Sequence, residues 1–142
     1  MSTVVPMLAY EDGPAAIEWL VRAFGFAEET RMVDPSGRVA HAELRLGDGS
    51  IYLATPTPDY QSPRHHREHC DAAAAWSRVP YVIDGVCVQV DDVDAHFERA
   101  KAAGAAILSE PADQPGIGIR HYRVEDLEGH RWMFEGPMRG DG

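Results

Sequence analysis

Three shortages mark this sequence, and each one excludes a class of protein. Its two cysteines, Cys70 and Cys87, are too few for the disulfide framework of a small secreted domain, so we expect a reduced, cytoplasmic setting. No apolar run approaches the roughly 20 residues that a membrane-spanning helix needs, so we expect no membrane partner. Residues 1–7 also lack a basic segment followed by an apolar one, which argues against a secretory signal.

Basic residues are the third shortage. Lys and Arg total 13 against 23 Asp and Glu, which gives a net charge of −10. Such a surface repels a phosphate backbone, so no nucleic-acid partner is expected. The same charge would attract a cationic ligand. The simpler interpretation, which we favour, is that the acidity keeps the protein in solution.

The same order of elements is expected twice along the chain. One helix begins near Asp12 and ends at Gly25, and another begins after Asp92 and ends at Gly104. Strands are expected at residues 4–9, 27–34, 39–46, 50–54, 85–90, 105–108, 119–125 and 130–135. A near-repeat of roughly 80 residues indicates a duplicated supersecondary unit.

These patterns predict an α+β fold of two pseudo-repeated βαβββ modules. The modules would form a curved mixed sheet around a cleft, with the helices outside. We expect the first module at 1–56 and the second at 84–136, followed by a flexible tail at 137–142. Between the modules, residues 57–83 form a proline-rich connector that carries a helix.

Two motifs in the second half carry a family resemblance. Residues 92–97 read DVDAHF and lead to AAGA at 102–105, and residues 125–132 read EDLEGHRW. They resemble the vicinal oxygen chelate superfamily, which contains glyoxalase I, extradiol dioxygenases and bleomycin-resistance proteins. The DxxGHRW ending resembles its glyoxalase-like, or PhnB-like, subgroup. The first half also fits, through the helix that Gly25 ends and the alternating strands that follow.

The resemblance implies paired βαβββ modules, usually in a homodimer, and a small-molecule ligand. Enzymes of the superfamily place one metal ligand on the first strand and one on the fourth strand of each module. The corresponding positions here are Val5, Tyr52, Gly85 and Met133. None of them offers the carboxylate oxygen or imidazole nitrogen that such sites use. We therefore expect no metal and no other cofactor.

The side chains expected to bind a ligand lie on strands that would line the cleft. They are His41, Glu43, Tyr52, Cys87, Gln89, Arg120, Tyr122 and Met133. His41 and Glu43 are two apart on a strand, so they project to the same side as Tyr52, where such a pair is suited to acid–base chemistry. Exposed partners on the open side of a sheet are the simpler alternative. No residue is assigned a catalytic role.

The orientation of the side chains is left open on one of the last two strands and is expected on the other. Arg120, His121, Tyr122 and Arg123 bring cations and an aromatic ring near the cleft, which suits a carboxylate or phenolate ligand. The sequence does not decide which of them face inward. On the last strand, alternation places Trp132 and Phe134 on the helix side, in the core.

The connector contains a second candidate metal site. At a spacing of four, His65 shares a helix face with His69, and His66 shares another with Cys70. A zinc site would need two further ligands, and no second Cys/His pair is present in the sequence. We favour a polar connector helix over a metal centre.

The leading functional hypothesis is a metal-free small-molecule binding protein of the glyoxalase/bleomycin-resistance type. Sequestration of a toxic or antibiotic-like ligand is one version of it. The alternative is a glyoxalase-like lyase or isomerase that acts on a small substrate in the same cleft. A purely structural or regulatory role is a third hypothesis, which a duplicated cleft fold disfavours.

Overall fold

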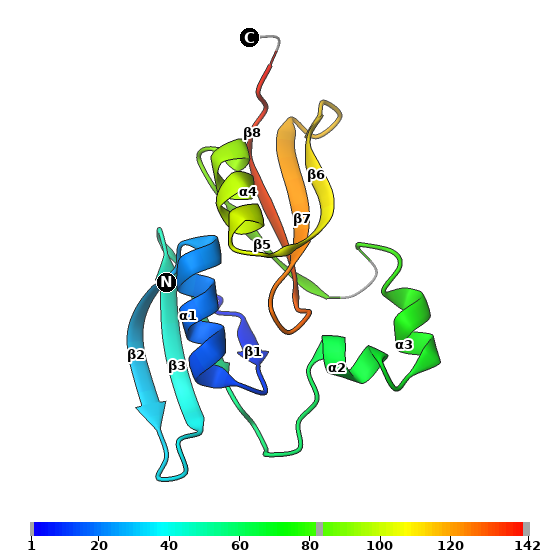
Figure 1. The fold of residues 1–142 in the computed structure, drawn as a ribbon. Coiled ribbons are helices and arrows are strands. Elements are labelled where there is room, and N and C mark those ends of the chain that lie inside the picture. Colours follow the sequence, from blue (N-terminus) through cyan, green and yellow to red (C-terminus); the bar gives the residue numbers. More distant parts are fainter. Residues whose placement is uncertain (1, 82–83, 141–142) are drawn as a thin grey trace.

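The computed structural model describes residues 2–81 and 84–140. The first module contains β1 (Met7–Ala9), α1 (Gly13–Phe24), β2 (Ala27–Val33), β3 (Val39–Leu46) and β4 (Gly49–Ala54). The second contains β5 (Gly85–Gln89), α4 (Val93–Ala102), β6 (Ala106–Gln114), β7 (Ile119–Glu125) and β8 (Arg131–Pro137). Between them lie α2 (Pro63–Arg67) and α3 (Asp71–Trp76), as Figure 1 shows, where one helix was expected. Parts of the expected first module (residue 1), connector (82–83) and tail (141–142) fall outside the described residues.

The helices of the two modules begin by the same local chemistry. The side chains of Asp12 and Asp92 each accept a hydrogen bond of 3.0 Å, from the backbone N–H of Ala15 and Ala95 respectively. Each bond pairs an N–H that has no partner within the first helical turn. Gly25 then ends α1 with a φ of 88°, a left-handed conformation that a residue with a Cβ adopts only with strain. No helix of the described residues is long and apolar enough to cross a membrane.

Each module folds into a mixed four-stranded sheet. The strand orders are β1–β4–β3–β2 and β5–β8–β7–β6, so the two sheets have the same topology. In each sheet, the module's first and last strands pair in parallel, and the other neighbours pair antiparallel. The predicted α+β fold of two βαβββ modules is confirmed. The predicted mixed sheet is divided into two, one for each module.

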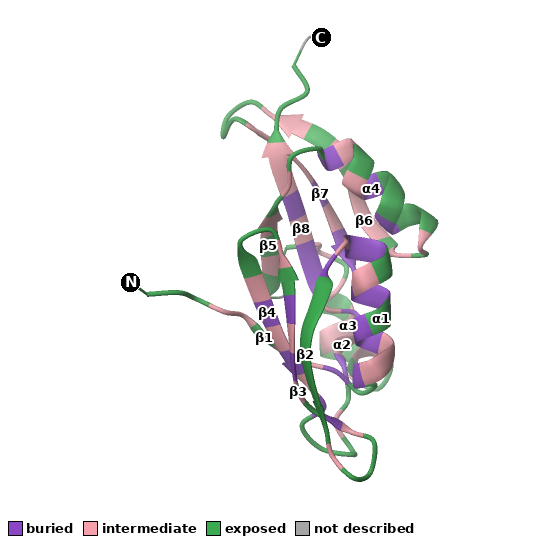
Figure 2. Cartoon of the chain, turned by 90° about the vertical axis from the view of Figure 1, so that its left-hand side faces the viewer, coloured by how far each residue is buried: buried purple, intermediate pink, exposed green. Residues whose placement is uncertain are grey.

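Helices α1 and α4 cover one face of the two sheets, and the other face is open (Figure 2). Phe24 of α1 lies in edge-to-face contact with Trp132 and Phe134 of β8, at ring-centroid distances of 5.2 Å and 4.8 Å. Trp132 and Phe134 are almost completely buried, as predicted. Because Phe24 belongs to the first module and its partners to the second, one continuous core joins the two modules.

Polar contacts reinforce this junction on the helix side. The Tyr10 hydroxyl donates to the buried Asp126 carboxylate at 2.6 Å. The Glu128 carboxylate accepts the backbone N–H groups of Glu11 and Asp12, at 2.6 Å and 3.0 Å. Part of the EDLEGHRW motif therefore holds the start of α1. Two of the three acidic residues in that motif, Asp126 and Glu128, therefore act at this junction.

The connector is fastened to both modules. Ser62 donates from its backbone N–H and its hydroxyl to the Glu11 carboxylate of the first module, at 3.0 Å and 2.6 Å. Arg67 of α2 forms two hydrogen bonds, of 2.7 Å and 3.0 Å, with Glu125 of the second. Glu125 also pairs with Arg131, which donates to backbone carbonyls of the connector.

Candidate functional site

The open face of the first sheet gathers three of the predicted ligand-binding residues. Glu43 of β3 pairs in register with Tyr52 of β4, and His41 is two residues from Glu43, so all three side chains project to the same side. The His41 Nε2 atom lies 3.1 Å from a carboxylate oxygen of Glu43. The His41 and Tyr52 rings meet edge to face at 5.0 Å. The adjacent Ala42 and Leu44 point into the core.

The open face of the second sheet gathers another three. Cys87 of β5 pairs in register with Met133 of β8, and Gln89 pairs with Glu135. These side chains therefore share one side of the sheet, opposite the buried Phe134. The sequence prediction named Cys87, Gln89 and Met133 and missed Glu135. Glu135 follows Met133 by two positions on the same strand, so its spacing contained the signal.

The expected placement of Arg120 and Tyr122 in the cleft is corrected by the structure. Both lie on the helix side of the second sheet. Tyr122 is completely buried, and its hydroxyl lies 2.6 Å from Nδ1 of His96 on α4. Arg120 donates two hydrogen bonds to Asp94, also on α4, at 2.9 Å and 3.1 Å. Helix α4 supplies a partner for each of these two polar side chains, which hydropathy alone does not show.

His121 and Arg123 alternate with those residues and occupy the open face instead. His121 pairs in register with Glu135, and Arg123 with Met133. Among the described residues, the buried Nδ1 atom of His121 has no hydrogen-bond partner. Burial, with a further contribution from the nearby Arg123 charge, lowers the pKa of His121. A neutral imidazole next to a cation and a carboxylate therefore faces the open side.

The Cys87 thiol is not prepared for nucleophilic chemistry. Although Cys87 is exposed as a residue, partial burial of its thiol, and secondarily the neighbouring Glu135 carboxylate, raises its pKa to about 11. Reactive cysteines instead have a lowered pKa, because the thiolate is the nucleophile. Cys87 is therefore a neutral lining residue at physiological pH.

A groove of about 1210 Å³ runs between the two modules beside these residues. On one side it is lined by the β3–β4 turn and on the other by β5 and the end of β8. Of the predicted residues, its described lining includes Cys87 and Gln89. The acidic residues Asp48, Asp91 and Glu135 also line it, so the groove is acidic.

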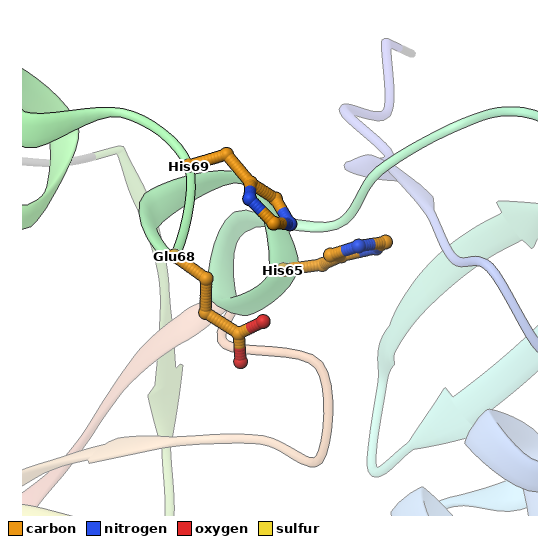
Figure 3. Close-up of side chains that lie close together, drawn as sticks. All are labelled: His65, Glu68 and His69. Carbon is orange, nitrogen blue, oxygen red and sulfur yellow. The ribbon is translucent and has the colours of Figure 1, made fainter.

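The connector brings together a separate set of potential ligands. His65, Glu68 and His69 each offer an atom, and these three atoms lie within 4.8 Å of one another (Figure 3). A spacing of four predicts the His65–His69 pair, and it does not predict Glu68, which is three residues from His65 at the C-terminal cap of α2.

Comparison with known proteins decides the family. The model of the Glyoxalase/Bleomycin resistance protein/Dioxygenase superfamily matches residues 3–134. The chain belongs to this superfamily. A curated relative, the uncharacterized protein Rv0887c of Mycobacterium tuberculosis, is 33% identical over 138 residues, which cover 94% of this chain and 74% of the relative.

Solved structures of the superfamily fold cover nearly the whole chain. TioX from Micromonospora sp. ML1 is 36% identical, with a TM-score of 0.69, over 99% of this chain and 100% of its own. TnmS3, an antibiotic binding protein from Streptomyces sp. CB03234, is 19% identical, with a TM-score of 0.61, over 96% and 98% of the two chains. At that identity, TnmS3 supports the fold alone.

The residues present do not fit the metal centre associated with superfamily enzymes. In register, the residue beside Tyr52 is Met7, and the residue beside Met133 is Cys87. These first-strand positions lie two residues beyond Val5 and Gly85, on the same face. The first pair offers the thioether of Met7 and the phenol of Tyr52. The second pair offers the thiol of Cys87 and the thioether of Met133. Divalent cations in oxygen and nitrogen sites require carboxylates or imidazoles, which these positions lack.

Proposed function

We propose that this superfamily member is a homodimeric protein that binds a small organic molecule in a cleft without a metal ion there. The observation that carries the proposal is the donor set at the two register pairs, Met7 with Tyr52 and Cys87 with Met133. A metal-dependent lyase or dioxygenase would need hard donors at such positions. The same positions, lined with soft and neutral groups, suit contact with an organic ligand.

Exposed apolar side chains support the dimer. Every residue of β2 is exposed, and Met7 and Met32 of the first sheet are 79% and 58% exposed. Met32 pairs in register with His41, so it lies on the open face. A second copy placed against this face would bury both methionines and cover the open strands. The cleft would then lie between sheets of two chains.

Charge supports a ligand with a cationic group. Asp48, Asp91 and Glu135 line the groove between the modules, which adjoins the proposed cleft at Cys87 and Gln89, and the whole chain carries a net charge of −10. The sequence also suggests a carboxylate ligand, which cations near the cleft would bind. That expectation is weakened because Arg120 forms an ion pair with Asp94. Sequestration of a toxic or antibiotic-like compound is the version of the function we propose. TnmS3 is an example of antibiotic binding on this fold.

A specific contact keeps the catalytic alternative open. The His41–Glu43 pair, at 3.1 Å and beside Tyr52, has the composition of a general base with an orienting carboxylate. A glyoxalase-like lyase or isomerase that uses this pair is the second candidate function. The free thiols of Cys70 and Cys87 suit the cytoplasmic location that forms part of both proposals.

The test is a thermal-shift screen of the purified protein in EDTA, with cationic antibiotics and small carboxylates as two arms. A ligand that binds only the folded state raises the melting temperature with its concentration. We expect cationic compounds to give such shifts, and a Gln89→Ala variant to reduce them. The binding proposal fails if neither arm shifts the melting temperature. Turnover of a bound compound that is abolished by His41→Ala would favour the catalytic alternative.

A further inference from the structure

Helix α2 and the two residues that follow it supply two imidazoles and a carboxylate. His65, Glu68 and His69 contribute one ligand atom each, all within 4.8 Å of one another (Figure 3). We propose that these three side chains form a binding site for a divalent transition metal of the zinc or nickel type, outside the cleft. The site does not depend on the function proposed for the cleft.

The helical spacing supplies the geometry. His65 and His69 are four residues apart, and their rings lie 5.4 Å apart at an interplanar angle of 63°. Glu68 retains helical backbone angles, with φ of −68° and ψ of −22°, so it projects one turn from His65. Metal–ligand bonds of about 2.0–2.2 Å require donors roughly 3–4 Å apart. Glu68 and His69 are exposed, so rotation of their side chains closes the remaining gap.

Glu11 orients the first ligand. Its carboxylate lies 3.1 Å from Nδ1 of His65, and because an ionised carboxylate only accepts hydrogen bonds, Nδ1 carries the proton. The lone pair of His65 is then on Nε2, free to bind a metal. Metal-binding histidines commonly donate their other N–H to a carboxylate in this way. Glu11 is itself fixed by two hydrogen bonds from Ser62.

The surrounding charges permit a cation. The two arginines of α2 are engaged elsewhere, Arg67 with Glu125 at 2.7 Å and Arg64 with the Asp126 carbonyl at 2.9 Å. The chain as a whole is strongly acidic. Two imidazoles with one carboxylate favour zinc, nickel or copper over calcium or magnesium, which prefer all-oxygen sites. Three protein ligands leave at least one position for water.

The location gives the site a structural consequence. α2 is held to the first module through Glu11 and to the second through Glu125. All three ligands come from residues 65–69, so a bound ion would order the connector beside the contacts with Glu11 and Glu125 that hold it to the two modules. Because the ion binds only the folded arrangement, it raises the stability of the folded chain.

Calorimetric titration of the metal-free protein with Zn²⁺ tests the site, and Co²⁺ absorption reports its ligands. We expect one ion per chain and a Co²⁺ spectrum without thiolate-to-metal charge transfer. His69→Ala, at an exposed position, should weaken Zn²⁺ binding at least about tenfold, and Glu11→Gln should weaken it by about tenfold. His66→Ala is the matched control, since it removes an exposed histidine from the same helix, and it should leave binding unchanged.

Two outcomes would overturn the site. One is that His69→Ala and His65→Ala bind Zn²⁺ as tightly as the wild type does, with both variants melting at the wild-type temperature. The other is loss of binding in Cys87→Ser or His41→Ala, which would move the ion to the open faces of the sheets. Ligand shifts in the thermal screen should persist in His69→Ala, so failure of this site and failure of the proposed cleft function are distinguishable.

Discussion

Cys87 of β5 lies directly beside Met133 of β8, in parallel register on the open face of the second sheet. Met7 and Tyr52 occupy the same relationship in the first sheet. Both modules therefore share the geometry of a two-strand site, but the four side chains of these two pairs include no carboxylate and no imidazole. The fold retains a position for chemistry that this chain's residues do not support, and an organic ligand is the occupant that fits them.

The dimer proposal predicts the effect of a charge on the open face. Met32→Glu places a carboxylate where the second copy would bury an apolar side chain, so association should weaken. Analytical ultracentrifugation should show a shift toward monomer with an unchanged circular dichroism spectrum. Ile117→Glu is the matched control, because Ile117 is equally apolar, 70% exposed and located on the β6–β7 turn. Equal effects of both variants would contradict the proposed interface.

The buried hydrogen bond between modules predicts a loss of stability. Tyr10→Phe removes the hydroxyl that donates to Asp126 at 2.6 Å and leaves a buried carboxylate oxygen with one partner fewer. The free energy of unfolding should fall by about 1–3 kcal/mol. Urea denaturation measures this loss. Tyr81→Phe is the control, since Tyr81 is 71% exposed and should change stability little.

The ion pairs under the connector predict a larger loss. Glu125 and Arg131 are both buried, at 2% and 4% side-chain exposure. Glu125→Ala leaves the Arg131 charge buried without its carboxylate partner, which should cost about 3–5 kcal/mol. Arg67→Ala removes a more exposed partner of the same carboxylate and should cost less. A smaller loss for Glu125→Ala than for Arg67→Ala would refute this ordering.

His96 predicts how stability depends on pH. Burial lowers the pKa of His96 below its usual 6.5, so the folded state binds fewer protons than the unfolded state in that range. The contribution of neutral His96 to the free energy of unfolding is fully present above pH 6.5. It is lost as the pH falls from 6.5 through the pKa of His96 in the folded state. His96→Gln keeps a donor and an acceptor without titrating, so it should flatten this part of the profile. An unchanged slope in denaturation measured from pH 7.5 to 5 would exclude His96 as its source.

Much of the fold follows from local patterns. Aspartates and glycines mark the ends of α1 and α4, and alternation marks the buried side of β3. Both signals act within a few residues, and the predicted helix ends and the predicted alternation are confirmed. The side of the sheet to which each β7 side chain points could not be predicted in this way. Polar and aromatic residues alternate along the middle of β7, so neither side is clearly the apolar one. Its orientation depends on Asp94 and His96 of α4, which receive Arg120 and Tyr122. Such partners come from packing, which the order of residues does not specify.

The candidate site was predicted in part for the same reason. His41, Glu43 and Tyr52 meet because alternation and a short hairpin determine their register. The parallel pairing of Met7 with Tyr52 joins segments far apart in the chain, and no turn sets its register, so the sequence alone does not show that Met7, two residues after Val5, lies beside Tyr52. Likewise, nothing in the connector's own sequence indicates that Glu11 orients His65.

The central claim is metal-independent binding in the cleft, and one measurement tests it most directly. Calorimetric titration of a compound that shifts the melting temperature is carried out on the His69→Ala variant, which lacks a ligand of the connector site, before and after dialysis against EDTA. The account predicts the same dissociation constant in both preparations. Binding that is lost on chelation and restored by adding a divalent metal would contradict it.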